Sequence, residues 1–135
     1  EQRVALAHVG DSRAYLIRNG RIRQLTDDHS VVAELVRRQQ ISADAAREHP
    51  HRHVLTRALG VRQHAAPDLA ELTPQPGDVI VLCSDGLTTH LSDGEIGSIV
   101  SLQEDPHVAC DLLVRGANRR GGIDNTTVLI VGYEK

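Results

Sequence analysis

The chain has 135 residues, a net charge of −3, 40% hydrophobic residues and 24% charged residues. This length fits one compact domain, and the composition is typical of a soluble globular protein. The small negative charge offers no basis for general binding to nucleic acid or anionic membranes, and no apolar stretch reaches the length of a membrane span.

The residues available for a core are unusual. The sequence contains no Phe, Trp or Met, so the predicted core consists of Val, Leu, Ile and Ala. Its two cysteines, Cys83 and Cys110, do not form a CxxC pair. Two such cysteines make no disulfide framework, and we expect both to be reduced thiols in a cytoplasmic protein.

The first elements are predicted to be strands. An apolar run over Arg3–Val9 ends at the tripeptide Gly10–Ser12. Two further β-prone runs, Arg13–Arg18 and Arg21–Leu25, flank Asn19-Gly20. Because both turn positions of a tight hairpin require positive φ, Asn-Gly between two such runs predicts a β-hairpin.

The middle of the chain is its most polar part, and the flap-like segment 31–52 is expected to be mobile. Ser30 is placed to cap a helix over Val31–Gln39, and Ser42 a short helix through Glu48, since a serine oxygen accepts from free N–H groups of a first helical turn. Two weaker strand candidates follow, at Val54–Leu59 and Ala66–Thr73.

The last part of the chain mixes strands and helices. The continuous apolar run Asp78–Cys83 predicts a strand buried on both faces. Ser92–Glu95 matches a capping box, and Asp105-Pro106 matches the N-cap and first position of a further helix. The β-branched segment Thr126–Val131 predicts a final strand.

Three aspartates lie at the ends of predicted strands. Asp11 and Asp85 follow strands, and Asp124 precedes the last one. The end of one antiparallel strand lies beside the start of its neighbour, so the three carboxylates could meet at one sheet edge. Clustered carboxylates raise one another's pKa, and a divalent cation relieves their repulsion. Oxygen ligands favour Mg²⁺ or Mn²⁺, which activate a water and hold phosphoryl oxygens.

The same aspartates have a simpler interpretation. An aspartate beside a glycine commonly builds a turn or caps a helix. On spacing alone, a metal site and three separate turns remain open alternatives.

Four blocks of sequence occur in a fixed order: "AHVGDSRAYLIRNGRIRQLTDDHS", "HPHRHVLTRALG", "GDVIVLCSDGLTTHLSD" and "GIDNTTVLIV". Together they resemble the C-terminal part of the bacterial metal-dependent type 2C (PPM) Ser/Thr protein phosphatases, over essentially the whole chain. The resemblance implies an α+β fold that is part of a four-layer α-β-β-α sandwich with two antiparallel sheets. It also implies that residues 31–52 correspond to the flap beside the active site.

The resemblance further implies a centre of two Mn²⁺ or Mg²⁺ ions, with a possible third. A metal-activated water would attack phosphoserine or phosphothreonine in proteins, which we expect to be substrates of a bacterial Ser/Thr kinase. By this resemblance Asp85 and Asp124 are metal ligands, and Asp11 is the ligand of the third metal.

The N-terminal blocks of the family, the Arg/Asn-Glu-Asp and Asp-Gly-Met-Gly-Gly stretches, do not occur in the sequence. In the family they supply a phosphate-binding arginine, an aspartate ligand, the ligand that bridges the two metals and usually a general-acid histidine. The sequence also has no methionine. We therefore expect residues 1–135 to be the C-terminal portion of one catalytic domain, with the N-terminal portion missing and negligible phosphatase activity on its own.

Two alternatives remain open. One is a non-catalytic regulatory module that keeps the fold and binds phosphoproteins. The other is a half-domain that is completed by a second chain.

Several other polar residues receive structural interpretations. His49, His51 and His53 alternate, but Pro50 argues against a strand that would align them as metal ligands. We expect His8 to be a satisfied histidine on a sheet face.

Five more residues have side chains that could take part in chemistry. We expect Cys83 to be an unreactive buried thiol, Arg13 to pair with a strand-end carboxylate and Asn125 to orient its loop. The spacing supplies no base that would make Ser12 or Thr56 a nucleophile.

Overall fold

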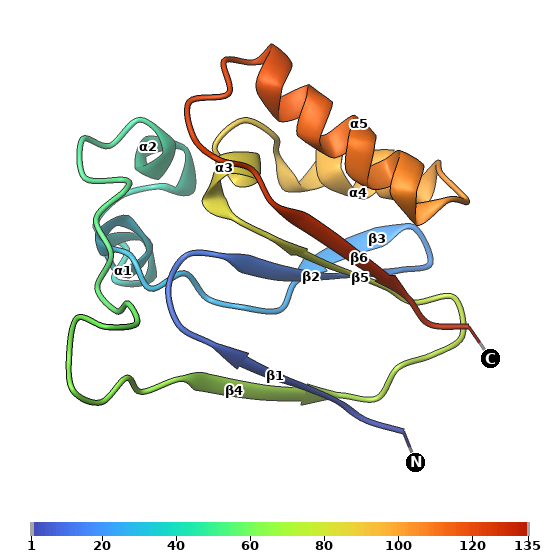
Figure 1. Cartoon of the computed structure of the whole chain (residues 1–135). Coiled ribbons are helices and arrows are strands. Elements are labelled where there is room, and N and C mark those ends of the chain that lie inside the picture. Colours follow the sequence, from blue (N-terminus) through green and yellow to red (C-terminus); the bar gives the residue numbers. More distant parts are fainter. Residues whose placement is uncertain (1, 135) are drawn as a thin grey trace.

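The computed structural model describes residues 2–134 and contains two antiparallel sheets and five helices (Figure 1). The strands are β1 (Val4–His8), β2 (Arg13–Arg18), β3 (Arg21–Gln24), β4 (Asp68–Leu72), β5 (Val79–Cys83) and β6 (Val128–Gly132). The helices are α1 (Val31–Arg37), α2 (Ala43–Arg47), α3 (Asp85–Thr88), α4 (Asp93–Ser101) and α5 (Pro106–Arg119).

The two sheets form separate layers. One pairs β1 with β4, and the other has the order β3-β2-β5-β6. Figure 1 shows α4 and α5 on one side of the four-stranded sheet and the β1–β4 sheet on its other side. The predicted α+β class with two antiparallel sheets is confirmed, and residues 2–134 contain three of the four expected layers.

The predicted hairpin forms at Asn19-Gly20. Both residues adopt positive φ, 52° at Asn19 and 72° at Gly20. The turn sets the antiparallel register of β2 and β3, in which Tyr15 lies opposite Gln24.

The helix caps follow the sequence signals. The Ser30 side chain accepts a hydrogen bond from the main-chain nitrogen of Ala33, and Ser42 makes the same bond to Ala45. The capping box of α4 is complete, since Ser92 N donates to the Glu95 carboxylate while Ser92 Oγ accepts from Glu95 N. The Asp105 side chain caps α5.

The main core lies between α3, α4, α5 and the helical side of the four-stranded sheet. Its members that are fully buried are Tyr15, Val81, Leu87, Ile96, Leu113 and Ala117. Apart from Tyr15, these are the aliphatic residue types that the sequence predicted. Gly97 allows α4 to approach the sheet closely, because a Cβ there would lie 3.1 Å from the Ile22 side chain.

The prediction that β5 is buried on both faces is wrong at one position. Val81 and Cys83 are buried toward the helices, whereas Leu82, on the opposite face, is 39% exposed. Its partner in β6, Leu129, is also exposed, while its partner in β2, Ala14, is buried. That face is therefore covered over β2 and open over β6 within residues 2–134.

Two further segments differ from the sequence expectation. The strand expected at Val54–Leu59 is wrong, because its backbone bonds to the loop before α1 rather than to a strand ladder: Thr56 N donates to His29 O at 2.8 Å. Only Leu55 pairs with Ser30, in an isolated bridge. The short helix α3, which starts at Asp85, was not predicted.

Candidate metal centre

An open cavity of about 520 Å³ lies where β1 and β5 end and α1 and α3 begin. Six carboxylates line it, those of Glu48 and of five aspartates: Asp11, Asp27, Asp28, Asp85 and Asp93. Sequence reasoning found Asp11 and Asp85 but missed the other four. Asp27 and Asp28 stand in the polar run "TDDHS", whose density of acidic residues was the signal that could have found them.

Asp11 is a half-buried carboxylate in this cavity. Burial raises its pKa, and the negative charges of Asp85 and Asp28 raise the pKa further. No ion pair within residues 2–134 involves Asp11 or Asp85. The structure thus brings two of the predicted aspartates to one cavity without a basic partner.

Asp85 owes its place to the end of β5. The chain leaves that strand at Ser84, which is the N-cap of α3, so that Asp85 becomes the first helical residue. Its carboxylate therefore lies at the helix N-terminus, where negative charge is favoured.

Asp124 does not line the cavity. Its Oδ1 accepts a hydrogen bond of 2.7 Å from Asn125 N. The loop that carries it is nevertheless attached to the start of α3, because Ser84 Oγ donates to Asn125 O at 3.3 Å and accepts from Thr127 N at 3.0 Å. The main chain holds Asp124 beside the segment of Asp85, while its side chain turns to its own loop.

Arg13 forms the ion pair that the sequence suggested. Its guanidinium binds both carboxylate oxygens of Asp28, at 2.7–3.2 Å, and donates to Tyr15 Oη at 2.9 Å. Tyr15 Oη in turn donates to Asp93 Oδ1 at 2.8 Å. The partner, Asp28, lies in the loop after β3 rather than at a strand end.

Basic side chains line the same cavity. Arg37, Arg47 and Arg52 come from α1, α2 and the loop that follows, and Arg37 Nη1 donates to Asp28 O at 3.3 Å. A cavity lined by both carboxylates and guanidinium groups suits a cation and a phosphoryl group bound together, because arginine binds phosphate oxygens in a bidentate manner. The paired carboxylates fit a hard divalent cation, which would remove their mutual repulsion.

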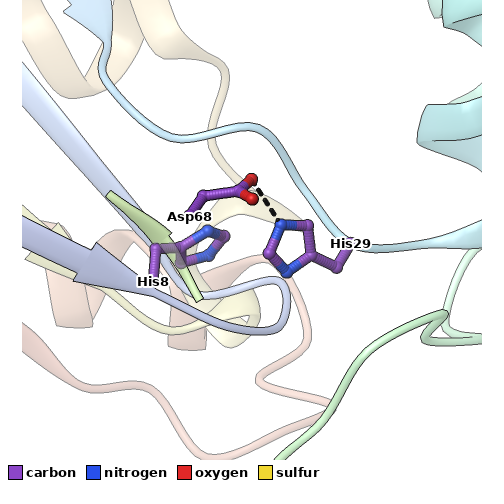
Figure 2. Close-up of side chains that lie close together, drawn as sticks. All are labelled: His8, His29 and Asp68. Carbon is purple, nitrogen blue, oxygen red and sulfur yellow. Dashed lines mark hydrogen bonds and ion pairs between the residues drawn. The ribbon is translucent and has the colours of Figure 1, made fainter. Parts of the chain in front are cut away.

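A different group of potential ligands is more compact. One ligand atom each from His8, His29 and Asp68 lies within 4.8 Å of the others (Figure 2). Within residues 2–134 this is the only such group of three, so Asp11, Asp85 and Asp124 do not gather as tightly. Sequence reasoning missed His29 and Asp68, which are far apart in the chain.

The remaining candidates occupy structural positions. His49 and His51 lie in a turn, where His49 Nδ1 accepts from His51 N, and they belong to no compact ligand group with His53 in the part of the chain described. Burial raises the pKa of the Cys83 thiol to about 11, which keeps it protonated and unreactive at neutral pH. Cys110 is also a free thiol.

Comparison with known proteins identifies one family. The sequence model described as "Protein phosphatase 2C" matches residues 1–126. The chain is 42% identical over 131 residues to the serine/threonine phosphatase stp of Listeria monocytogenes, covering 97% of this chain and 52% of that protein. It thus spans about half the length of the curated relatives that it matches.

Solved structures agree with this. The PPM Ser-Thr phosphatase MsPP of Mycobacterium smegmatis, in complex with cacodylate, superposes with a TM-score of 0.86 at 45% identity, over 95% of this chain and 55% of that one. The catalytic domain of the phosphatase PstP, in complex with two manganese ions, superposes with a TM-score of 0.86 at 35% identity, over 96% and 53% of the two chains. Within residues 2–134, no helix has the length and apolar character needed to cross a membrane.

Proposed function

The chain belongs to the protein phosphatase 2C family, and on that basis we propose that it forms the C-terminal portion of a catalytic domain that hydrolyses phosphoserine and phosphothreonine in proteins. The observation that carries this proposal is the pair Asp11 and Asp85, two carboxylates that share one cavity without a basic partner. In the absence of a cation, such an arrangement is electrostatically unfavourable, as the raised pKa of Asp11 indicates.

The proposed cofactor is Mn²⁺ or Mg²⁺, as two ions with a possible third. Asp85 and Asp124 would hold the main centre, and Asp11 would hold the third ion. A related catalytic domain was solved with two manganese ions, which supports this choice. Bound there, the cations would supply an activated water and neutralise charge on the phosphoryl oxygens.

The residues of this chain have separate tasks in that reaction. Asp85 and Asp11 would hold the cations, while Arg47 and Arg52, which line the same cavity, would bind an incoming phosphoryl group. Arg13 is unsuited to that task because Asp28 already binds it through both carboxylate oxygens. We assign Arg13 instead to fixing the loop after β3, in which Asp28 lines the cavity.

We propose that the isolated 135 residues bind Mn²⁺ only weakly, at high metal concentration, and have negligible activity, because affinity for a hard cation falls with the number of charged ligands. The proposed substrates are cytoplasmic proteins that a bacterial Ser/Thr kinase has phosphorylated. The alternative of a non-catalytic phosphoprotein-binding module is less well supported, since all three aspartates of the family pattern are present.

A chimera tests the proposal. Residues 1–135 would replace the matching part of the Listeria phosphatase stp, and the purified chimera would be assayed with a phosphothreonine peptide and Mn²⁺. We expect metal-dependent turnover by the chimera, at least a hundredfold loss in its Asp85→Asn variant, and no turnover by the isolated chain. The estimate of about a hundredfold follows from loss of one metal ligand.

Each other outcome has a defined meaning. A folded, Mn²⁺-binding chimera that binds the phosphopeptide without turnover would favour the non-catalytic alternative. Metal-dependent turnover by the isolated chain would contradict the proposed inactivity, and a folded chimera that binds no Mn²⁺ would contradict the proposed metal centre.

A further inference from the structure

The main chain on both sides of Asp11 is held by histidines. On one side, Gly10 N donates to His29 Nδ1 at 3.1 Å, and His29 N donates to Gly10 O at 2.9 Å. On the other side, His8 Nε2 donates to Ser12 O at 2.7 Å, since a carbonyl oxygen can only accept. The loop Gly10–Ser12 is thus fixed at three main-chain atoms.

His29 is the better anchored of the two histidines. It is 2% exposed and comes from the segment that leads into α1. Figure 2 shows its ring directed at Asp68 of β4, with His8 of β1 alongside. The ring centroids of His8 and His29 are 4.8 Å apart.

The hydrogen bonds define the tautomer of His29. Because Nδ1 accepts from Gly10 N, it carries no proton, so Nε2 carries the proton and donates it to Asp68 Oδ2 at 2.7 Å. The other oxygen of Asp68 accepts from Arg57 Nη1 at 2.9 Å. The bond from His29, followed by that from Arg57, lowers the pKa of Asp68 to about 2, so Asp68 remains an acceptor at neutral pH.

This tautomer argues against a metal ion between the three side chains. The atom of His29 that faces Asp68 carries a proton, and an ion there would also compete with Arg57 for the carboxylate. His8 Nδ1 is buried and has no partner among residues 2–134, so the expectation of a satisfied histidine is wrong for this atom. Nδ1 offers a lone pair, but a single lone pair makes no site. The group is better described as a hydrogen-bonded chain that ends at Gly10.

We propose that His29, oriented by Asp68, is a positioning residue for Asp11. The φ of Gly10 is 111°, in a region that L side chains rarely adopt, and glycine has unusual freedom of backbone conformation. Other contacts must therefore fix the direction in which the chain continues to Asp11. His29 fixes both polar groups of Gly10 and thereby sets where the Asp11 carboxylate enters the cavity. This inference rests on the proposed role of Asp11 as a metal ligand.

Two substitutions separate the two contacts of His29. In His29→Asn the amide oxygen stands near the place of Nδ1 and retains an acceptor for Gly10 N. In His29→Gln the amide nitrogen stands near the place of Nε2 and retains a donor for Asp68 while the acceptor for Gly10 is lost. Asp68→Asn removes the charge that orients His29 at a half-exposed position, where the fold tolerates the change.

The measurement is Mn²⁺ binding by the 135-residue chain, followed by electron paramagnetic resonance of the free ion. We expect His29→Gln to weaken Asp11-dependent binding by about tenfold or more, the range found for residues that orient metal ligands. Asp68→Asn should weaken this binding by less, because the amide oxygen can still accept from His29 Nε2. His29→Asn should stay within about threefold of the original chain. In an Asp11→Asn background, none of these substitutions should have any further effect, which a merely structural role would not predict.

The outcomes distinguish this inference from the proposed function. If the original chain shows Mn²⁺ binding that Asp11→Asn removes, but His29→Gln and Asp68→Asn bind equally well, the positioning role is overturned and the proposed function stands. If the original chain shows no Asp11-dependent binding, the metal role of Asp11 fails and the inference fails with it. Stoichiometric Zn²⁺ binding that is lost in His8→Ala would show a metal site in place of the hydrogen-bonded chain.

Discussion

Gly86 and Asn125 are in direct main-chain contact: a Cβ on Gly86 would lie only 2.2 Å from Asn125 O. Real Cβ atoms essentially never lie so close to another atom, so any side chain at this position would force the main chain to shift. The contact joins the first turn of α3, which carries Asp85, to the loop that carries Asp124. Two aspartates distant in the sequence are thereby held on neighbouring segments.

Replacing Gly86 should separate these two segments. We expect Gly86→Ala to lower the free energy of unfolding by about 1 to 3 kcal/mol, the usual range for overpacking against a rigid neighbour, measured by urea denaturation. Gly94→Ala is the matched control, because its Cβ would meet no atom within 4 Å and its φ is not positive. That control should be stabilising by about 0.5 to 1 kcal/mol, since alanine is favoured over glycine in a helix. Equal effects of the two substitutions would contradict the contact.

The buried hydroxyl of Tyr15 links Arg13 to Asp93. Tyr15→Phe removes this link and leaves two polar groups with fewer partners, so we expect a loss of about 1 to 3 kcal/mol in unfolding free energy. Tyr133→Phe is the control; its hydroxyl contacts the exposed Gln2, and the change should stay within about 0.5 kcal/mol. Thermal unfolding followed by circular dichroism measures both. An unchanged stability of Tyr15→Phe would show that the link contributes nothing.

Asp78 should stabilise the fold in a pH-dependent manner. It is 2% exposed, and the hydrogen bond from Arg18 lowers its pKa below the ordinary 3.8. A lowered pKa in the folded state means that the stabilisation is fully present above 3.8 and is lost as the pH falls through the folded-state pKa. The difference in unfolding free energy between the original chain and Asp78→Asn should therefore shrink in acid. A difference that is independent of pH would contradict the ion pair.

The ionised carboxylate of Asp11 should affect the stability of the fold in the opposite direction to that of Asp78. Its pKa is raised above 3.8 by burial and by Asp85, so the ionised group destabilises the metal-free fold at neutral pH. We expect Asp11→Asn to be more stable than the original chain at pH 7 without metal, with an advantage that disappears as the pH falls toward 3.8. Denaturant titrations at several pH values measure this. If Asp11→Asn were the less stable protein at pH 7, the carboxylate would have a structural partner that the geometry does not show.

The sequence predicted the parts of the fold that depend on neighbours in the chain. The hairpin at Asn19-Gly20 and the caps at Ser30, Ser42 and Ser92 were found because a turn or a cap is decided within a few residues. The exposure of Leu82 was missed for the opposite reason, since it depends on how far the second sheet extends.

The site divides in the same way. Asp11 and Asp85 stand at strand ends, where their neighbours in the sequence reveal them. Asp28 and His29, in the loop before α1, pair with Arg13 of β2 and Asp68 of β4. No local sequence pattern predicts such pairings. For Asp124, the sequence spacing predicted the position of the segment but not the direction of the side chain, which binds its own loop.

The most direct test of the proposed centre is the effect of Mn²⁺ on the unfolding midpoint of the 135-residue chain. A ligand that binds only the folded state raises the midpoint as its concentration rises. We predict a saturable increase for the original chain, none for the Asp85→Asn variant, and a smaller increase for the Asp11→Asn variant, which loses only the ligand of the third ion. An equal increase in all three proteins, or none in the original chain, would contradict a cation site at these carboxylates.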